Sequence, residues 1–373
     1  MLLLLALLVL AAPDTLDVPL YDRVDRALDS LRVEHDLPGL AVAVLEDGHV
    51  AFARGYGWAD LEGGRPVTAA TPFRIASLTK PLAASLLLRQ VEHGRLDLDR
   101  PFADYAEGHD RWCQIFTSPE VLEQEPVLRD LVADWRCRNE RDRLTVRHYL
   151  THTAQGEPGA AYRYNGFLYG QLFRVAEGVG GRPFADLLQD SLFTPLGMTR
   201  TLPSQADSTR PDVLADLALP YQTSTGRPER ADWPRPLGAN AGAGVVSTVL
   251  DLARFDAALD HGEVIGSETR DASTTPSRSS VTGERLPYGL GWFVQDLGGE
   301  PAVWHYGWQP GAYSGLWLRL PRRGLTLILL SNGEELSSGF GLGEGDVERS
   351  PFARAFLDVV RSFGRLRTGP RGR

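Results

Sequence analysis

Two residues that stand three positions apart, Ser77 and Lys80, could together do acyl-transfer chemistry. Lys80 is the only lysine among 39 lysine and arginine residues. Arginine keeps its proton in proteins, whereas a lysine can lose it when it is buried or lies near another cation. On a helix, positions i and i+3 share a face, so the amine could take the hydroxyl proton and make the serine a nucleophile. An ordinary serine near a surface lysine gives the same pattern, so other segments must support this chemistry.

The segment that carries the pair is predicted to begin a helix. Apolar residues at 86–88 and at Val91 follow at helical spacing, and Pro81 falls in the first turn, where proline is tolerated. Ser77 would then lie near a helix N-terminus. Backbone N–H groups at that end favour developing negative charge, which suits a nucleophile.

The remaining elements are predicted from hydrophobic periodicity and turn signals. Strands and helices are expected near both chain ends, and a helical, loop-rich pattern covers 99–234. The expected elements are a helix at 21–35, a hairpin of 40–45 and 50–55, a helix at 175–188, a helix at 252–259 capped at Thr248, strands at 288–294, 313–320 and 325–330, and a helix at 352–363. We therefore expect an α/β lobe from 21–98 and 235–363, and a helical lobe from 99–234 with an insert at 105–144.

Composition narrows the classes of partner and the cellular location. A length of 373 residues favours two lobes, and a net charge of −9 argues against nucleic acid as a partner. Residues 1–12, MLLLLALLVLAA, are too short to span a bilayer as a helix and are typical of a secretory signal. We expect a periplasmic or secreted protein without a stable membrane span, or a cytoplasmic one if this segment is not a functional signal. Residues 364–373 are expected to form a flexible tail.

Four further patterns each allow more than one interpretation. Cys113 and Cys137 could form a disulfide in an exported protein, or remain as two buried thiols. His148 and His152 have the spacing of zinc ligands on a helix, but no third ligand accompanies them, so we predict no metal site. The glycine-rich segment 339–345 lacks the residues of a phosphate-binding loop, so a flexible loop is favoured. Aromatic side chains in the insert could cover the site as a lid, although core packing is the default: Trp112, Phe116 and Trp135.

Four ordered segments together resemble the serine β-lactamase and penicillin-binding-protein superfamily, in particular its class C β-lactamase-like and esterase branch. They are Ser77-Leu78-Thr79-Lys80, Leu150-Thr151-His152-Thr153 with the 158–166 segment PGAAYRYNG, Tyr288-Gly289-Leu290-Gly291-Trp292, and His305-Tyr306-Gly307-Trp308-Gln309-Pro310-Gly311. The resemblance covers about residues 24–363. It implies an α+β, β-lactamase-like fold in which N- and C-terminal helices flank an antiparallel sheet and a mostly helical lobe is inserted.

The resemblance also implies roles for individual residues. Ser77 would be the acylated nucleophile and Lys80 its basic partner. Tyr164 would be the tyrosine of the second motif, with Tyr162 as a rival, and would carry the second proton. The backbone N–H groups of Ser77 and Trp308 would form the oxyanion hole. Such donors are worth roughly 3–4 kcal/mol each in acyl transfer.

Two positions in the substrate-binding segments depart from the superfamily pattern. Gly166 stands where an asparagine usually holds a substrate amide, and Asn165 occupies the middle position of that motif. His305 and Gly307 belong to the third motif, on the edge strand beside the nucleophile, where β-lactamases usually have lysine at the first position. A histidine need not carry the charge that a lysine offers to a substrate carboxylate. Both departures weaken the prediction of antibiotic hydrolysis.

We therefore predict a serine hydrolase that forms an acyl-enzyme on carboxylic esters or small amides and needs no cofactor. A β-lactamase or a D-alanyl or D-amino-acid peptidase is the first alternative. A non-catalytic binding module that kept the fold is the second. The sequence leaves open the physiological substrate, the oligomeric state and which of Lys80 and Tyr164 is the acylation base.

Overall fold

A computed structural model describes residues 20–223, 226–232 and 238–363. The predicted signal at 1–12 and the predicted tail at 364–373 lie outside the described residues. Within the described part of the chain, no helix is both long enough and apolar enough to cross a bilayer.

The central element is an antiparallel sheet of seven strands, in the order β3-β2-β1-β11-β10-β9-β8. Its strands are β1 (Gly39–Glu46), β2 (His49–Asp60), β3 (Arg65–Pro66), β8 (Phe293–Asp296), β9 (Pro301–Gln309), β10 (Tyr313–Leu320) and β11 (Leu325–Ser331). The two shorter sheets pair β4 (Phe73–Arg74) with β7 (Val246–Ser247), and β5 (Tyr221–Gln222) with β6 (Glu229–Arg230). Strands from both chain ends therefore meet where β1 pairs with β11.

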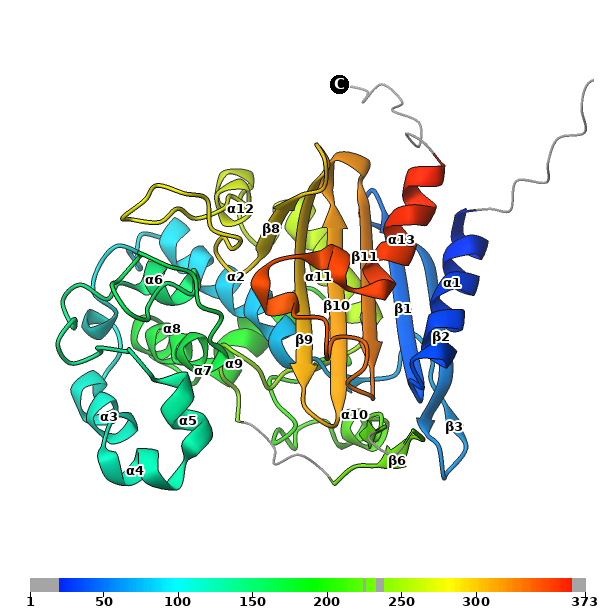
Figure 1. Ribbon diagram of the computed structural model, residues 1–373, viewed down its shortest axis with the longest axis horizontal. Coiled ribbons are helices and arrows are strands. Elements are labelled where there is room, and N and C mark those ends of the chain that lie inside the picture. Colours follow the sequence, from blue (N-terminus) through cyan, green and yellow to red (C-terminus); the bar gives the residue numbers. More distant parts are fainter. Residues whose placement is uncertain (1–19, 224–225, 233–237, 364–373) are drawn as a thin grey trace, which may run out of the picture.

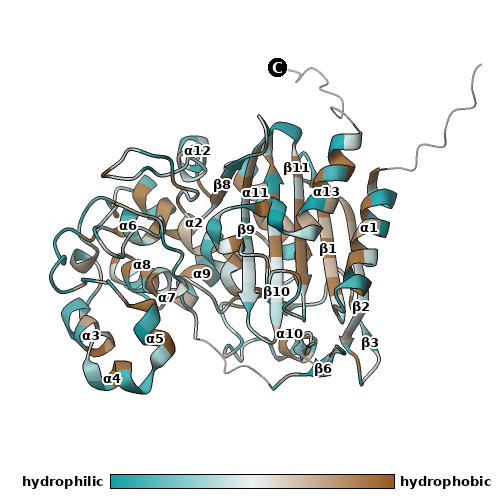
Figure 2. Cartoon of the chain, in the orientation of Figure 1, coloured by the Kyte–Doolittle hydropathy of each residue, from teal (hydrophilic) through white to brown (hydrophobic). Residues whose placement is uncertain are grey.

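Helices cover both faces of the large sheet. Figure 1 shows α1 (Leu20–Glu34) and α13 (Pro351–Ser362) side by side on one face, with α11 (Val249–Asp260) on the other. The outward sides of α1 and α13 are largely hydrophilic (Figure 2). The remaining helices are α2 (Thr79–Glu92), α3 (His109–Phe116), α4 (Pro119–Gln124), α5 (Pro126–Leu131), α6 (Val146–Leu150), α7 (Gly166–Gly170), α8 (Leu172–Gly180), α9 (Phe184–Leu188), α10 (Pro211–Ala215) and α12 (Ser267–Ser273).

This architecture confirms the predicted fold class. Two of the helix and strand limits predicted from hydrophobic periodicity were wrong. The helix expected over 175–188 is two helices, because Gly181 adopts a φ of +65° after α8 and Pro183 precedes α9. The strand expected over 288–294 begins only at Phe293. Gly291, with a φ of +97°, stands in the preceding turn, and a side chain there would collide with Ala84.

The insert is a small packed unit that includes α3, α4 and α5. Cys113 and Cys137 form a disulfide within it. The indole rings of Trp112 and Trp135 are buried and stacked, with centroids 5.8 Å apart. Phe116 meets Phe167 of α7 edge-on. These tryptophans therefore pack the insert, which was the default expectation.

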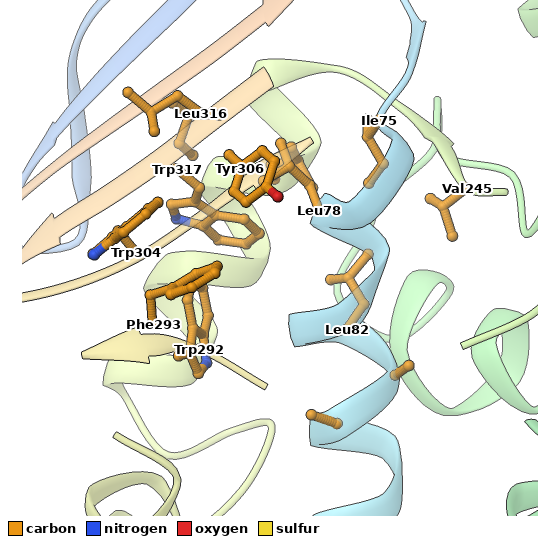
Figure 3. Packing of buried hydrophobic residues seen from close by; sticks show 14 of the residues in the cluster. Ile75, Leu78, Leu82, Val245, Trp292, Phe293, Trp304, Tyr306, Leu316 and Trp317 are labelled. Carbon is orange, nitrogen blue, oxygen red and sulfur yellow. The ribbon is translucent and has the colours of Figure 1, made fainter. Parts of the chain in front are cut away.

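The main hydrophobic core is continuous between the sheet and the helices around the nucleophile segment. Figure 3 shows Leu78 directed toward side chains of the sheet, with Tyr306 beside it. This packing places the start of α2 against β9 and β10.

Candidate active site

Ser77 lies in a short 3-10 turn, Ala76–Leu78, directly before α2. Between Thr71 and Leu88, all of which the structure describes, every residue is buried except Ser77, which is partly exposed. The preceding residue, Ala76, has a φ of +47°. This left-handed conformation costs an L-residue roughly 1–2 kcal/mol, and nothing in the sequence indicated it. The turn thus presents one hydroxyl from an otherwise buried segment.

Lys80 lies in the first turn of α2 and has no solvent exposure. Its Nζ donates hydrogen bonds to Ser77 Oγ at 2.7 Å and to the Gly242 carbonyl at 3.0 Å. Burial lowers the pKa of Lys80 to about 7. At neutral pH the amine therefore exists in comparable protonated and neutral forms, and the neutral form can accept the Ser77 proton.

The ring of Tyr164 lies beside Lys80, whose Nζ is 5.0 Å from the ring centroid. The Tyr164 hydroxyl is buried without a hydrogen-bond partner in the described structure. Burial raises the pKa of Tyr164 well above its usual value, while the nearby Ser77 hydroxyl lowers it by less. A neutral phenol beside Ser77 is suited to donate a proton rather than to remove one.

Tyr162, the rival tyrosine, directs its hydroxyl elsewhere. It donates a hydrogen bond to the Gly343 carbonyl at 2.8 Å. The geometry therefore favours Tyr164 over Tyr162 as the tyrosine next to the nucleophile.

Strand β9 passes directly beside the nucleophile turn. β8 pairs only with 301–304 of β9, so 305–309 form the free half of that strand's edge. A side chain at Gly307 would lie 2.4 Å from the Ile75 carbonyl oxygen and 3.3 Å from Leu78 Cγ. Glycine is thus required for β9 to approach Ser77 closely, and this approach brings Trp308 to the mouth of the site.

The side chain of His305 is not arranged to bind substrate, contrary to expectation. It is fully buried, its Nδ1 lies 2.7 Å from the Tyr306 carbonyl oxygen, and its Nε2 lies 2.9 Å from the Tyr288 hydroxyl. Burial and the charge of Lys80 lower the pKa of His305 well below 6.5. The imidazole is therefore neutral, and both ring nitrogens have partners inside the protein.

Asn165 is also occupied within the protein, because its side chain caps α7. Its Oδ1 accepts from the Leu168 N–H at 3.0 Å, and its Nδ2 donates to Gln155 Oε1 at 2.9 Å and to the Leu131 carbonyl. Gly166 is the position that faces the site, since a Cβ there would point to Lys80 Nζ at 3.8 Å. The expected amide-holding side chain is therefore missing, and Asn165 does not replace it.

Trp308 is 44% exposed, and its indole N–H donates to Glu334 Oε2 at 2.8 Å. A cavity of about 270 Å³ lies next to it and to the nucleophile turn. Its lining residues are Arg74, Ala76, Ala243, Gly244, Trp308, Gln309 and Pro310. Mostly small or apolar residues thus border open space on the Trp308 side of Ser77.

Sequence reasoning missed two contributors to the site. The Gly242 carbonyl accepts a hydrogen bond from Lys80 and belongs to the segment NAGAG at 240–244. The glycines of this segment were the only feature of the sequence that could have indicated a close approach of the backbone to the site. No role at the site was predicted for His152, yet the centroid of its ring lies 4.5 Å from that of Tyr164, and its Nδ1 accepts from the Asn165 N–H. His148 Nδ1 accepts from the Thr145 N–H. Among the described residues, no group of three or more potential metal ligands is brought together.

In a comparison with protein families, residues 24–344 match the family described as Beta-lactamase. Penicillin-binding protein 4* of Bacillus subtilis is 26% identical over 82% of this chain and 70% of its own. Penicillin-binding protein 4 of Amycolatopsis lactamdurans is 30% identical over 84% of this chain and 85% of its own. A D-aminopeptidase of Gluconobacter oxydans is 27% identical over 76% of this chain and 54% of its own.

Solved structures with the same fold include an octameric penicillin-binding protein homologue from Pyrococcus abyssi, with a TM-score of 0.71 and 21% identity over 90% of this chain and 77% of the other. EstCE1, described as a hydrolase with promiscuous acyltransferase activity, has a TM-score of 0.65 and 19% identity over 90% of this chain and 98% of its own.

Proposed function

The chain belongs to the Beta-lactamase family and is a serine hydrolase, and we propose that Ser77, Lys80 and Tyr164 perform its chemistry. The observation that carries this proposal is the 2.7 Å hydrogen bond between Lys80 Nζ and Ser77 Oγ. Burial lowers the pKa of this lysine to about 7. An amine with a pKa near the working pH is an effective general base.

Acylation proceeds in two steps in this proposal. Ser77 Oγ attacks the substrate carbonyl carbon while its proton moves to neutral Lys80 Nζ. The carbonyl oxygen becomes an oxyanion, which the backbone N–H groups of Ser77 and Trp308 stabilise. The bond to the leaving group then breaks, and the departing oxygen or nitrogen receives a proton from Tyr164, which Lys80 reprotonates.

Water completes the reaction by attacking the acyl-enzyme. Its proton passes to Lys80, which is neutral again after reprotonating Tyr164, the ester bond to Ser77 breaks, and Lys80 returns the proton to the serine. In this scheme the side chains of Ser77, Lys80 and Tyr164, the oxyanion hole, the substrate and water account for every step.

Carboxylic esters and small amides are the substrates that this site favours. Gly166 offers no side chain to a substrate amide, and His305 is buried and neutral, so it offers no charge to a carboxylate. An ester needs only the nucleophile, the proton carriers and the oxyanion hole. The cavity beside Ala76 and Trp308 gives room for an apolar acyl group.

D-Amino-acid peptide hydrolysis is the second candidate, since a D-aminopeptidase is among the relatives. β-Lactam hydrolysis ranks below it, because a cephalosporin presents both an amide and a carboxylate to the two altered positions.

We also propose that the protein is exported. Residues 1–12 are typical of a secretory signal, and the Cys113–Cys137 disulfide is the kind of bond that persists in oxidising compartments.

Two measurements on purified protein test this function. A fluorophosphonate should add once, on Ser77, and a Ser77→Ala variant should stay folded, unlabelled and inactive.

A substrate panel should give a kcat/KM for a short-chain aryl ester at least about a hundredfold above that for a chromogenic cephalosporin, roughly 2.7 kcal/mol. D-Alanyl anilides complete the panel, and each rate is divided by that of uncatalysed hydrolysis. Labelling elsewhere would overturn the site assignment, and a corrected ratio favouring the cephalosporin would overturn the esterase assignment.

A further inference from the structure

The glycine-rich segment 339–345, which we call the glycine strap, lies against the tyrosines of the site. It belongs to the connection between β11 and α13, which passes in front of β9 and β10 in Figure 1. The sequence suggested a flexible loop here. The contacts of the strap suggest a wall of the site instead.

Gly343 is the residue of the strap that lies against the tyrosines. Its carbonyl accepts the hydrogen bond of the Tyr162 hydroxyl at 2.8 Å. A Cβ at this position would lie 3.0 Å from the Tyr306 hydroxyl and 3.9 Å from Tyr164 Cβ. The strap backbone therefore lies against two tyrosines, and a side chain at position 343 would require the Tyr306 hydroxyl to shift by a few tenths of an ångström.

The strap is held in place on both sides. On its C-terminal side, Asp346 Oδ1 accepts from Gln295 Nε2, and the Val347 N–H donates to Gln295 Oε1, both at 2.9 Å. On its N-terminal side, Ser337 Oγ donates to the Gly315 carbonyl at 3.1 Å. Between these anchors, Gly339, Gly341 and Gly345 have positive φ angles. Leu342 is buried in the main hydrophobic core, and the Tyr162 hydrogen bond links the next residue, Gly343, to the segment carrying Tyr164.

This position corresponds to the leaving-group side of the reaction. The group that protonates the leaving atom must come within hydrogen-bond reach of it. Under the proposed function, on which this inference rests, that group is Tyr164. The acyl group would extend the other way, toward the cavity beside Trp308.

We propose that the glycine strap, held by Tyr162, limits the size of the leaving group, so that the preferred substrates are esters or amides of small alcohols or amines. Tyr162 is then a specificity-determining residue that acts through Gly343. Loosening its hydrogen bond lets the strap move away and admits larger leaving groups.

The test compares two esters with the same acyl group, ethyl butyrate and 1-naphthylmethyl butyrate, each corrected for its rate of hydroxide hydrolysis. Wild-type protein should favour the ethyl ester by at least about tenfold in kcat/KM. Tyr162→Phe should raise the ratio of naphthylmethyl to ethyl turnover at least about fivefold. Tyr105→Phe is the matched control, because it removes a hydroxyl that accepts from the Asp97 N–H outside the site. This control should leave the ratio unchanged.

Hydrogen exchange provides a second readout. Backbone amides of the strap should exchange faster in Tyr162→Phe than in wild type. Unchanged exchange would overturn the role of Tyr162 as the link, and faster exchange with an unchanged ester ratio would overturn the size-limiting role of the strap. If wild-type protein hydrolyses neither ester and Ser77 is not labelled, the proposed function itself fails, and the inference fails with it.

Discussion

Two buried cations, Lys80 and Arg319, show how the same fold can make one charge structural and another reactive. Arg319 on β10 forms ion pairs with Asp256, Nε to Oδ1 at 2.8 Å, and with Asp260. Asp256 also accepts from the Trp317 indole N–H and the Thr326 hydroxyl, both at 2.9 Å. Burial opposes the charge of Arg319, but the two carboxylates outweigh it and raise the arginine's pKa.

Lys80 is equally buried, but its amine donates hydrogen bonds to a hydroxyl and a carbonyl, and two tyrosine rings lie near it. Among the residues that the structure describes, no carboxylate offsets its desolvation, and its pKa falls to about 7. The difference between the two cations lies in their partners rather than in their depth. A buried cation with carboxylate partners holds the structure together, and one with neutral partners is ready to lose a proton.

The largest expected effect comes from Lys80→Arg, which places a permanent cation beside the nucleophile. We expect kcat/KM for a short-chain aryl ester to fall at least about a thousandfold, roughly 4 kcal/mol, and nearly as far as in Lys80→Ala. Arg319→Lys is the reciprocal control and should keep activity within about threefold. Activity of Lys80→Arg within about tenfold of wild type would show that the lysine acts only as a charge.

Replacing each cation by methionine should change stability in opposite directions. Arg319→Met leaves Asp256 buried without its partner and should lower the free energy of unfolding by at least about 3 kcal/mol. Lys80→Met removes a desolvated amine and should raise it, at the expense of activity. Denaturant unfolding at pH 6.5 measures both changes. Loss of stability in Lys80→Met would mean that the lysine is held by attractions that this account omits.

The gain in Lys80→Met should itself depend on pH. The folded-state pKa of Lys80, about 7, lies below its unfolded value. At a pH between these two pKa values, the unfolded chain binds more protons than the folded chain. The stability of the wild-type protein therefore rises with pH in this range. The methionine advantage is therefore fully present below pH 7 and disappears as the pH approaches about 10. Unfolding curves at pH 6, 8 and 9.5 follow it, and an advantage that grows with pH would contradict this sign.

The pH dependence of catalysis is the next expected effect. Because neutral Lys80 accepts the Ser77 proton, kcat/KM should rise about tenfold per pH unit below pH 7 and level off above it. The rate of Ser77 labelling by a fluorophosphonate should follow the same curve. A flat profile from pH 5.5 to 8 would separate Lys80 from the rate-limiting proton transfer.

The smallest expected effect concerns the backbone of the nucleophile turn. Glycine tolerates the φ of +47° at Ala76, but it loses more chain entropy on folding than alanine does. Ala76→Gly should therefore raise the free energy of unfolding by only about 0.5–1 kcal/mol, measured by denaturant unfolding. A comparable loss of stability would show that the turn is not strained.

Hydrophobic period and turn residues act locally, so they predicted individual elements, whereas the fold class followed from the resemblance of the motif segments to the superfamily. The hairpin at β1 and β2 and the helices at both ends follow directly from those patterns. Helix and strand limits near Gly181 and Gly291 were wrong, because a pattern of apolar residues does not record a positive φ.

Within the site, the proximity of Ser77 and Lys80 could be predicted, because the two residues lie three positions apart at the start of one helix. The environment of His305 could not, since its burial depends on Tyr288 packing from another segment. The same holds for the Gly242 carbonyl, which reaches Lys80 from 162 positions away in the chain. Tertiary contacts decide whether a polar residue binds substrate or supports the structure.

The most direct test of the central claim is the titration of Lys80 by NMR. Because Lys80 is the only lysine of the chain, lysine labelled with ¹³C at Cε should give a single resonance from the site. A midpoint near pH 7 is predicted for the folded protein, moving to the ordinary lysine value near 10.4 when the chain is unfolded. A midpoint near 10 in the folded protein would contradict the account, because Lys80 would then be a permanent cation at neutral pH.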